Sequence, residues 1–347
     1  MRVAVVIVTY NSARFIPDCL GSLSRIEKGG LETDVIVIDN GSTDASVEML
    51  KAYPFAEVVP TGKNLGFAGG NNLGIRMALD RGCEYVYLLN HDTEATPRFL
   101  VEAVAMAETD PKIGAAQSLL LLSPDKELVN STGNAIHFLG FGYCMDYRRR
   151  ADSLKFEGRK EIAYASGAGV LLRASALKKV GLFDEELFLY HEDLDLGWRL
   201  RLAGYVNVLA PKSVVHHKYE FSRSISKYYY MERNRYVVHV KNLRWWTLLV
   251  LAPWLALSEL GLLAVSFRSG WWKEKRKVYG YFLKPAAWRH MMAGRKETAK
   301  LRTVGDREIV RLFTPTISFQ DVTGPFTKYV ANPIMTAVWA VARILII

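Results

Sequence analysis

The segment FDEELFLYHEDLDLGWRLRLAGY, residues 183–205, concentrates carboxylates just ahead of an amphipathic pattern. Apolar residues recur there at i, i+4 and i+7 from Leu196, which predicts a helix with one face packed inward. Glu192 and Asp193 fall at or just before its first turn, where free amide groups and the helix dipole favour negative charge. Asp193 is therefore either a helix cap or a catalytic base with Glu192 beside it.

Two other residues have the chemistry to hold a divalent cation. Asp92 follows an apolar run in LLNHDTEA, and Mg²⁺ and Mn²⁺ take oxygen ligands, with one or two protein carboxylates beside phosphate oxygens. His217 ends another strand-like run and could add a nitrogen ligand, whereas the adjacent His216 points to the opposite face by strand alternation. A histidine at the position of His91, on the facing side of its strand, is more often structural.

Two motifs could bind a nucleotide. In DNGSTD, residues 39–44, the Asp39 carboxylate stands at a strand tip and could accept hydrogen bonds from a nucleobase or a ribose, although a helix-capping turn is an equal alternative. NLGFAGGNNLG, residues 64–74, precedes a helix and has four glycines, which let the backbone approach a ligand closely. It is neither GxGxxG nor GxxxxGK[ST], so by itself it is a weak signal.

The elements that must position these residues alternate between strands and helices. Such alternation predicts a parallel α/β sheet whose ligands bind at the carboxyl ends of the strands. Polar, turn-forming residues follow three of the predicted strands directly, so three strand ends should converge on one edge. Strands are predicted at 3–8, 34–39, 56–59, 84–89, 162–172 and 205–209, and helices at 13–25, 44–53 and 69–81.

Composition bounds the remaining possibilities. The chain has 347 residues, half of them hydrophobic, and a formal net charge of +10. Its three cysteines are scattered without a CxxC pair, which indicates a reducing compartment and no structural zinc. The first apolar run, residues 3–8, is too short for a signal-peptide core and predicts a buried strand. We expect a cytoplasmic protein on this basis.

The C-terminal part is basic and apolar together. Residues 218–307 carry 19 Lys and Arg against 6 Asp and Glu, which invites a nucleic-acid hypothesis. The same part contains the run 245–267, whose only charge is Glu259, with tryptophans and basic residues at its flanks. That pattern favours anionic lipid, so we expect a membrane partner and no nucleic acid. The run could span, re-enter or lie on the membrane, or form a buried helical hairpin; residues 330–347 form a second apolar stretch.

Taken together, the motifs resemble one family. Over about residues 3–240 the chain is similar to the inverting glycosyltransferases of family 2, and most to a bacterial branch described as rhamnosyltransferases. It has NHD where members often have NPD or DXD, but it retains the metal-binding acid. The motifs that carry the resemblance are VTYNS (8–12), DNGSTD (39–44), NLGFAGGNNLG (64–74), NHD (90–92), SGAGVLLR (166–173), GLFDEELFLYHEDLDLGWRLRLAGY (181–205), HHKYEFS (216–222) and YYYMERN (228–234).

The resemblance implies a GT-A fold, a mixed, mostly parallel sheet flanked by helices, in a catalytic domain over residues 1–240. A helical, basic and aromatic membrane-associating region would follow over 241–347. Asp92 and His217 would hold Mn²⁺ or Mg²⁺, Asp193 would act as general base and Glu192 would position the acceptor or the base. The donor, a dTDP-, UDP- or GDP-linked sugar, would be bound by Thr9, Tyr10, Asn11, Asp39, Ser42, Asn64, Gly66, Asn71, Asn72 and His91.

The acceptor implied by the resemblance is a lipid-linked glycan or a growing polysaccharide at the inner face of the cell membrane, in cell-wall or polysaccharide biosynthesis. Two alternatives belong to other classes. A sugar-nucleotide pyrophosphorylase would need a basic, glycine-rich loop after the first strand, and this chain has TYNSARF there. A catalytically inactive membrane-binding adaptor would keep the fold, but the intact acids and His217 speak against it.

Overall fold

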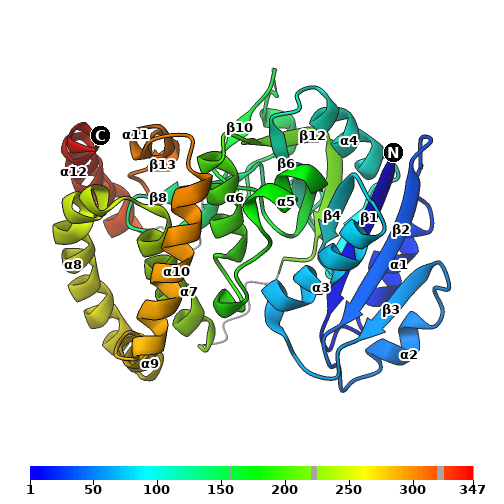
Figure 1. Cartoon of the computed structure of the whole chain (residues 1–347), viewed down its shortest axis with the longest axis horizontal. Coiled ribbons are helices and arrows are strands. Elements are labelled where there is room, and N and C mark those ends of the chain that lie inside the picture. The colour runs from blue at the N-terminus through cyan, green and yellow to red at the C-terminus, as the bar shows by residue number, and fades with distance from the viewer. Residues whose placement is uncertain (157, 220–224, 319–323, 347) are drawn as a thin grey trace. The chain divides into compact units, whose positions relative to one another are not determined.

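The computed structural model in Figure 1 describes residues 1–156, 158–219, 225–318 and 324–346. The chain forms two compact units. The first unit comprises residues 1–134, 144–200 and 205–220, and the second unit comprises 135–143, 201–204 and 221–347. The end of the HHKYEFS motif, residues 220–222, lies outside the described residues.

A ten-stranded sheet forms the centre of the first unit, in the order β10-β12-β6-β11-β4-β1-β2-β3, with β5 paired to β12 and β7 to β6. The strands β1 to β4 pair in parallel, as do β6 and β12, whereas β11 runs antiparallel between β4 and β6. The strands are β1 (Arg2–Thr9), β2 (Glu32–Asp39), β3 (Ala56–Pro60), β4 (Tyr85–Leu89), β5 (Thr93–Ala95), β6 (Ile113–Leu122), β7 (Val129–Ser131), β10 (Glu161–Ile162), β11 (Gly169–Arg173) and β12 (Val206–His217).

Helices flank this sheet because each presents an apolar face to it. In α1, for example, Ile16, Cys19, Leu20 and Leu23 are buried at helical spacing. The fully apolar run of β1 is buried on both faces, as expected for an interior parallel strand. The helices are α1 (Ile16–Leu23), α2 (Ser46–Leu50), α3 (Gly66–Asp80), α4 (Phe99–Glu108), α5 (Ala174–Val180) and α6 (Glu192–Leu202).

The predicted mixed α/β fold with a mostly parallel sheet is confirmed. The four predicted N-terminal strands and three helices are all present, but the run 162–172 divides into β10 and β11. The last predicted strand, 205–209, continues as β12 to His217 through an irregularity between Ala210 and Val214. This extension carries the histidine pair into the sheet itself.

Two glycines of the predicted ligand-binding motif have a packing role instead. A Cβ at Gly74 would lie 2.3 Å from Val6 Cγ1, and a Cβ at Gly70 would lie 2.8 Å from Val8 Cγ1. Both glycines therefore let α3 approach β1 closely. The glycine-rich segment is already helical from Gly66, three residues earlier than predicted.

The second unit is mainly helical (Figure 1). Its helix α7 packs against α9 and α10, so the structure groups α7 with the C-terminal helices rather than with the sheet. The elements are α7 (Lys227–Asn242), α8 (Trp245–Arg268), α9 (Trp272–Phe282), α10 (Pro285–Leu301), α11 (Asp306–Ile309), α12 (Asn332–Leu345) and a small sheet in the order β13-β8-β9, formed by β8 (Asn134–His137), β9 (Gly142–Cys144) and β13 (Phe313–Thr314).

The predicted apolar run forms one continuous helix, α8, of 24 residues with Pro253 inside it. Its most apolar window has a mean hydropathy of 2.1, and only 6% of that window is buried. The alternative of a buried helical hairpin is therefore wrong. Among the described residues, α8 is the one helix with the length and composition to cross a membrane.

The close approach of α3 to β1 predicts a stability difference between two Gly→Ala variants. Gly74→Ala should destabilise the protein by about 1–3 kcal/mol, because the new methyl group overpacks against Val6. Gly21→Ala in α1 is the control, since a Cβ there would meet, beyond the backbone of its own helix and among the described residues, only Arg25 Nη1 at 3.9 Å. It should be neutral or stabilising by up to about 1 kcal/mol. Thermal denaturation followed by circular dichroism compares the two, and equal melting temperatures would contradict the packing role.

Candidate active site and family membership

The ends of β1 and β2 form one polar corner. Thr9 Oγ1 lies 3.4 Å from Asp39 Oδ1, and the Ser42 amide donates to Asp39 Oδ2 at 3.2 Å. The Asn11 amide donates to Ser42 Oγ at 3.0 Å, with Asn11 in the left-handed region at φ 49°. Tyr10, between them, is 45% exposed. The corner thus presents an exposed aromatic ring beside a buried carboxylate.

The loop before α3 is held by two asparagines. Asn40 accepts from the Leu65 amide at 2.9 Å and donates to the Gly66 carbonyl at 3.0 Å. Asn64 accepts from the Gly66 amide at 2.8 Å, which caps the helix start. Gly66 has φ 73°, and a Cβ there would lie 2.5 Å from Phe188. Asn40 was not predicted, because its partners lie some 25 residues away.

Asn71 and Asn72 turn inward from α3. Asn71 donates to the Phe67 carbonyl at 2.9 Å within its own helix. Asn72 donates to the Phe183 carbonyl and to Glu185 Oε1, both at 2.9 Å, and accepts from the Phe183 amide at 3.0 Å. These contacts fasten the segment that leads to Asp193, so the geometry gives Asn72 a positioning role.

Asp92 and His217 meet where β5 pairs with β12. Thr93 stands opposite His217 in that antiparallel pair, which brings His217 Nε2 to 3.2 Å from Asp92 Oδ1. Two ligands at about 2.1 Å from one ion and at right angles to each other would be about 3 Å apart. The pair therefore has the separation of two adjacent ligands of an octahedral cation.

The hydrogen bonding around this pair fits a metal as well. His217 Nδ1 donates to Asn130 Oδ1 at 2.9 Å, which orients the ring so that Nε2 faces Asp92. Among the described residues, no partner donates a hydrogen bond to the buried Asp92 Oδ1. A contact of 3.2 Å between Nε2 and Oδ1 needs either a proton on the ring or a cation between the two atoms. Asn130, on β7, was not predicted, since nothing in its local sequence marks it.

The charge state of Asp92 suits the same role. Burial works to raise its pKa, but His217 and then His91 outweigh burial, and the net pKa lies below the ordinary value. The Asp92 carboxyl is therefore ionised at neutral pH. The described residues contain no cluster of three or more His, Cys, Asp or Glu side chains arranged for a metal, so this centre is a pair.

The other two histidines have different surroundings. His91 Nδ1 lies 3.0 Å from the Val8 carbonyl, and its ring lies 5.6 Å from that of Phe15. His216 pairs with Glu94 across the β5–β12 ladder. Alternation along β12 thus separates the two adjacent histidines, and it is His217 that faces Asp92, as predicted.

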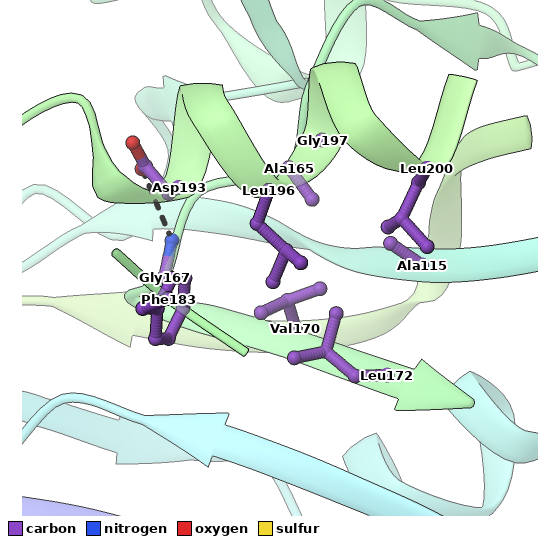
Figure 2. Close-up of a pocket in the computed structure, with 10 residues that line it drawn as sticks. All are labelled: Ala115, Ala165, Gly167, Val170, Leu172, Phe183, Asp193, Leu196, Gly197 and Leu200. Atoms are coloured by element: carbon purple, nitrogen blue, oxygen red, sulfur yellow. Dashed lines mark hydrogen bonds between the residues drawn. The ribbon is translucent and has the colours of Figure 1, made fainter. Parts of the chain in front are cut away.

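A short chain of contacts connects the Asp92 strand end to Asp193. The Asn90 amide, just after β4, donates to the Ala168 carbonyl at 3.1 Å, just before β11. The neighbouring Gly167 amide donates to Asp193 Oδ2 at 3.4 Å (Figure 2). Both acids therefore belong to the same edge of the sheet.

Figure 2 also shows apolar side chains of α6 and β11 below Asp193, among them Leu196, Val170 and Leu172. The cavity they enclose has a volume of only ≈ 10 Å³, room for about one water molecule. It is too small for a sugar. Its effect is to withdraw solvent from one side of the carboxylate.

Burial sets the protonation of the two acids at the start of α6. It raises the pKa of Asp193 to about 6, although the amides of Leu194 and Gly167 act in the opposite direction. Burial and the charge of Asp193 raise the pKa of Glu192 well above its ordinary value. At neutral pH Asp193 is thus mostly ionised, and both acids hold their protons more firmly than exposed carboxyl groups do. Asp193 is partly exposed and can still meet a substrate hydroxyl.

The backbone before these acids is strained. Phe188, Tyr190 and His191 have φ values of 61°, 67° and 69°, a left-handed conformation that costs a non-glycine residue energy. Asn72 and the start of α3 hold this segment in place from the other side, since the Ala68 amide donates to the Phe188 carbonyl. Strain of this kind clusters at functional sites.

Residues 4–181 match the family model described as "Glycosyl transferase family 2". The chain belongs to this family. It is similar to the N-acetylglucosaminyl-diphospho-decaprenol L-rhamnosyltransferase of Mycobacterium tuberculosis, with 31% identity over 238 residues that cover 62% of this chain and 75% of the relative. The resemblance found in the sequence motifs is confirmed.

Solved structures agree on the fold. One is GalNAc-T7 with UDP, GalNAc and Mn²⁺, with a TM-score of 0.56, 16% identity and coverage of 71% of this chain and 48% of that chain. Another is the mannosyltransferase PcManGT from Pyrobaculum calidifontis in complex with GDP-Man and Mn²⁺, with a TM-score of 0.51, 18% identity and coverage of 86% of both chains. The GT-A-like fold is confirmed.

The geometry of the pair predicts how variants bind Mn²⁺. If His217 is a metal ligand, His217→Ala should weaken Mn²⁺ binding in the presence of UDP by at least about tenfold. Asn130→Leu should weaken Mn²⁺ binding by about 10–100-fold, since the hydrogen bond that orients the His217 imidazole ring would be lost. His216→Ala is the matched control and should change the affinity less than about twofold. Electron paramagnetic resonance of free Mn²⁺ measures all three, and the reverse order of the two histidines would contradict the assignment.

Proposed function

We propose that this chain is a metal-dependent, inverting glycosyltransferase that moves a sugar from a nucleoside-diphosphate donor to a hydroxyl group of an acceptor. The observation that carries the proposal is the arrangement at one sheet edge of the Asp92–His217 pair and the partly exposed Asp193. Membership of glycosyl transferase family 2 supports the same reaction class.

The donor would lie along the strand ends of β1, β2 and β4. Thr9, Tyr10, Asn11 and Asp39 would hold the nucleoside, with Tyr10 free to stack on the base. Ser42, Asn64, Gly66 and Asn71 would shape the surrounding wall, and Asn72 would act by fixing the 183–185 segment. His91 would brace the wall through Val8.

The donor diphosphate would lie against Asp92 and His217. Mg²⁺ or Mn²⁺ bound there would neutralise the charge that develops on the departing nucleoside diphosphate. Two protein ligands are enough, because phosphate oxygens and water complete the shell of such ions. The Mn²⁺ in the two solved structures named above supports this cofactor for the fold.

Asp193 would take the proton of the acceptor hydroxyl as the hydroxyl oxygen attacks the anomeric carbon. The new glycosidic bond forms as the bond to the diphosphate oxygen breaks on the opposite face, which inverts the configuration. A pKa of about 6 suits a base at neutral pH. Glu192 beside it, whose own pKa is raised by burial and by the charge of Asp193, would orient the acceptor.

The M. tuberculosis relative is named for transferring rhamnose to a decaprenol-diphosphate-linked sugar. This name supports rhamnose as the first sugar to test and a lipid-linked glycan as acceptor, with a polysaccharide as the alternative. A lipid-linked acceptor would place the enzyme at the cytoplasmic face of the cell membrane in cell-surface glycan synthesis. The exposed apolar helix α8 supports a membrane location.

A thermal-shift screen tests the donor. The chain is heated with dTDP-, UDP- and GDP-linked sugars, dTDP-rhamnose among them, with and without Mn²⁺. A bound donor raises the melting temperature by mass action, and the rise should require Mn²⁺. If none of these donors stabilises the chain with Mn²⁺ present, the proposed donor class is wrong.

The raised pKa of Asp193 predicts the pH dependence of transfer. Below about pH 6 the carboxyl is protonated and cannot accept a proton, so the rate should fall tenfold per pH unit there and level off above. Asp193→Asn should lower turnover by about 10²–10⁴-fold, leave donor affinity unchanged and remove this acid limb. Glu186→Gln, an exposed acid in the same segment, is the control. A loss of donor affinity with normal turnover would make Asp193 structural.

Metal removal gives a separate expectation. Dialysis against EDTA should abolish transfer by the parent chain, and added Mn²⁺ should restore it. Asp92→Ala should stay inactive after Mn²⁺ is returned, because the remaining His217 cannot hold the ion with the diphosphate alone. Full activity of Asp92→Ala in EDTA would show that transfer needs no metal.

A further inference from the structure

One face of α8 is apolar along its whole length and is exposed. Leu249, Leu257 and Leu260 are 63%, 61% and 65% exposed, and Trp246 and Phe267 continue the face toward the two ends. At 1.5 Å per residue, 24 residues extend over about 36 Å. An apolar surface of this extent marks an interaction site.

The opposite face of α8 carries Glu259, the only charged residue inside the apolar run. Two tyrosines donate to its carboxylate at 2.6 Å, Tyr236 from α7 and Tyr279 from α9. Two bases pair with it as well, Arg235 of α7 at 3.2 Å and Lys275 of α9 at 2.7 Å. Glu259 is therefore bound from both neighbouring helices.

This network is balanced in charge, and all of its charged members except the partly exposed Glu259 are buried. Lys275 is 0% and Arg235 is 1% exposed, and Glu232 of α7 pairs with both of them. Two acids and two bases thus satisfy each other inside the second unit. The network fixes which side of α8 faces protein and which side faces outward.

The same network opposes a membrane-spanning α8. Glu259 lies near the middle of the helix, so a span would carry it and its charged partners toward the bilayer centre, where charges are costly. The helices α7 and α9 would have to follow, but they have 16 and 11 residues and are rich in charge, whereas a span needs about 20 apolar residues. A helix lying in the membrane plane avoids both problems.

A second helix enlarges the apolar face. The indole N–H of Trp246 donates to the carbonyl of Leu345 at the end of α12, at 2.8 Å. From α12, Ile334, Val341 and Ile344 are exposed, Ile344 to 78%. Both helices belong to the second unit and can contact one surface together.

Charge complementarity selects the partner. The exposed Arg244 and Arg268 flank α8, Arg343 is exposed on α12, and residues 218–307 carry a surplus of 13 positive charges. We propose that α8 and α12 dock the second unit in the plane of one leaflet of an anionic membrane, without crossing it. The proposal deepens the membrane location given above and rests on it, but it does not depend on sugar transfer.

A topology experiment decides between lying on the membrane and spanning it. Arg244→Cys and Ser269→Cys place a thiol at each end of α8 in the full chain, and inverted inner-membrane vesicles expose the cytoplasmic face to a membrane-impermeant maleimide. Both thiols should be labelled without detergent, each at least about tenfold above the parent, whose own cysteines are buried or half-buried. Labelling of one end only before detergent is added would show a span and overturn the proposal.

A vesicle experiment tests the face itself. Leu257→Glu/Leu260→Glu should lower the fraction of purified protein that sediments with vesicles of 70% phosphatidylcholine and 30% phosphatidylglycerol by at least about tenfold. The control Val47→Glu/Phe55→Glu alters two exposed apolar residues of the first unit and should change it less than twofold. Circular dichroism and the Mn²⁺-dependent donor thermal shift show that each variant is folded.

Two other results would overturn the proposal. In one, the α8 variant binds vesicles as strongly as the parent. In the other, neither protein binds vesicles, and light scattering shows that the parent is a dimer whereas the α8 variant is a monomer. The apolar face would then contact a second copy of the chain. Because sedimentation and labelling need no sugar transfer, failure of the proposed reaction would leave both readouts intact.

Discussion

The burial of two adjacent carboxyl groups at the start of α6 is the constraint on which the active site depends. Burial raises the pKa of both Glu192 and Asp193, and the charge of Asp193 raises that of Glu192 further, so charge on one of them disfavours charge on the other. This arrangement requires apolar packing below Asp193, an amide from Gly167 and a strained approach through residues 188–191. The contacts of Asn72 and of the start of α3 with residues 183–188 stabilise this strained backbone.

The Asp92–His217 pair follows from sheet topology in a similar way. Asp92 and His217 are 125 residues apart, yet the β5–β12 ladder places them side by side and Asn130 fixes the ring. The antiparallel β11 starts where β4 ends, which brings the Asp193 contact to the same edge. One sheet edge therefore collects the proposed metal-binding pair and the proposed base. That is the combination a displacement at an anomeric carbon with an anionic leaving group requires.

Local patterns were enough to predict the fold, because strand and helix periodicity can be recognised in short stretches of sequence. They also singled out Asp92, Asp193 and His217, which the structure brings to one edge of the sheet. They failed where the role depends on a distant partner. Nothing in the local sequence around Asn130 and Asn40 indicates their roles. Asn72 was interpreted as a contact to the nucleotide-sugar donor, whereas its side-chain amide group forms hydrogen bonds to the backbone of Phe183. Gly70 and Gly74 were read as part of a ligand loop, whereas the structure uses them to pack α3 on β1. Composition likewise could not distinguish the orientations of α8.

The orientation of α8 depends, like the two acids of α6, on the cost of burying charge. Mean hydropathy describes α8 as a whole, but the orientation of an apolar helix depends on the position of its charged residues. In α8 that residue is Glu259, the only charge in the run 245–267. Because Arg235, Lys275, Tyr236 and Tyr279 satisfy it from one side, the helix has a face packed on protein and an opposite, exposed apolar face, which we propose contacts lipid. An apolar helix that carries a fully partnered acid at its midpoint, with partners on short polar helices, is built for a boundary and not for the bilayer interior.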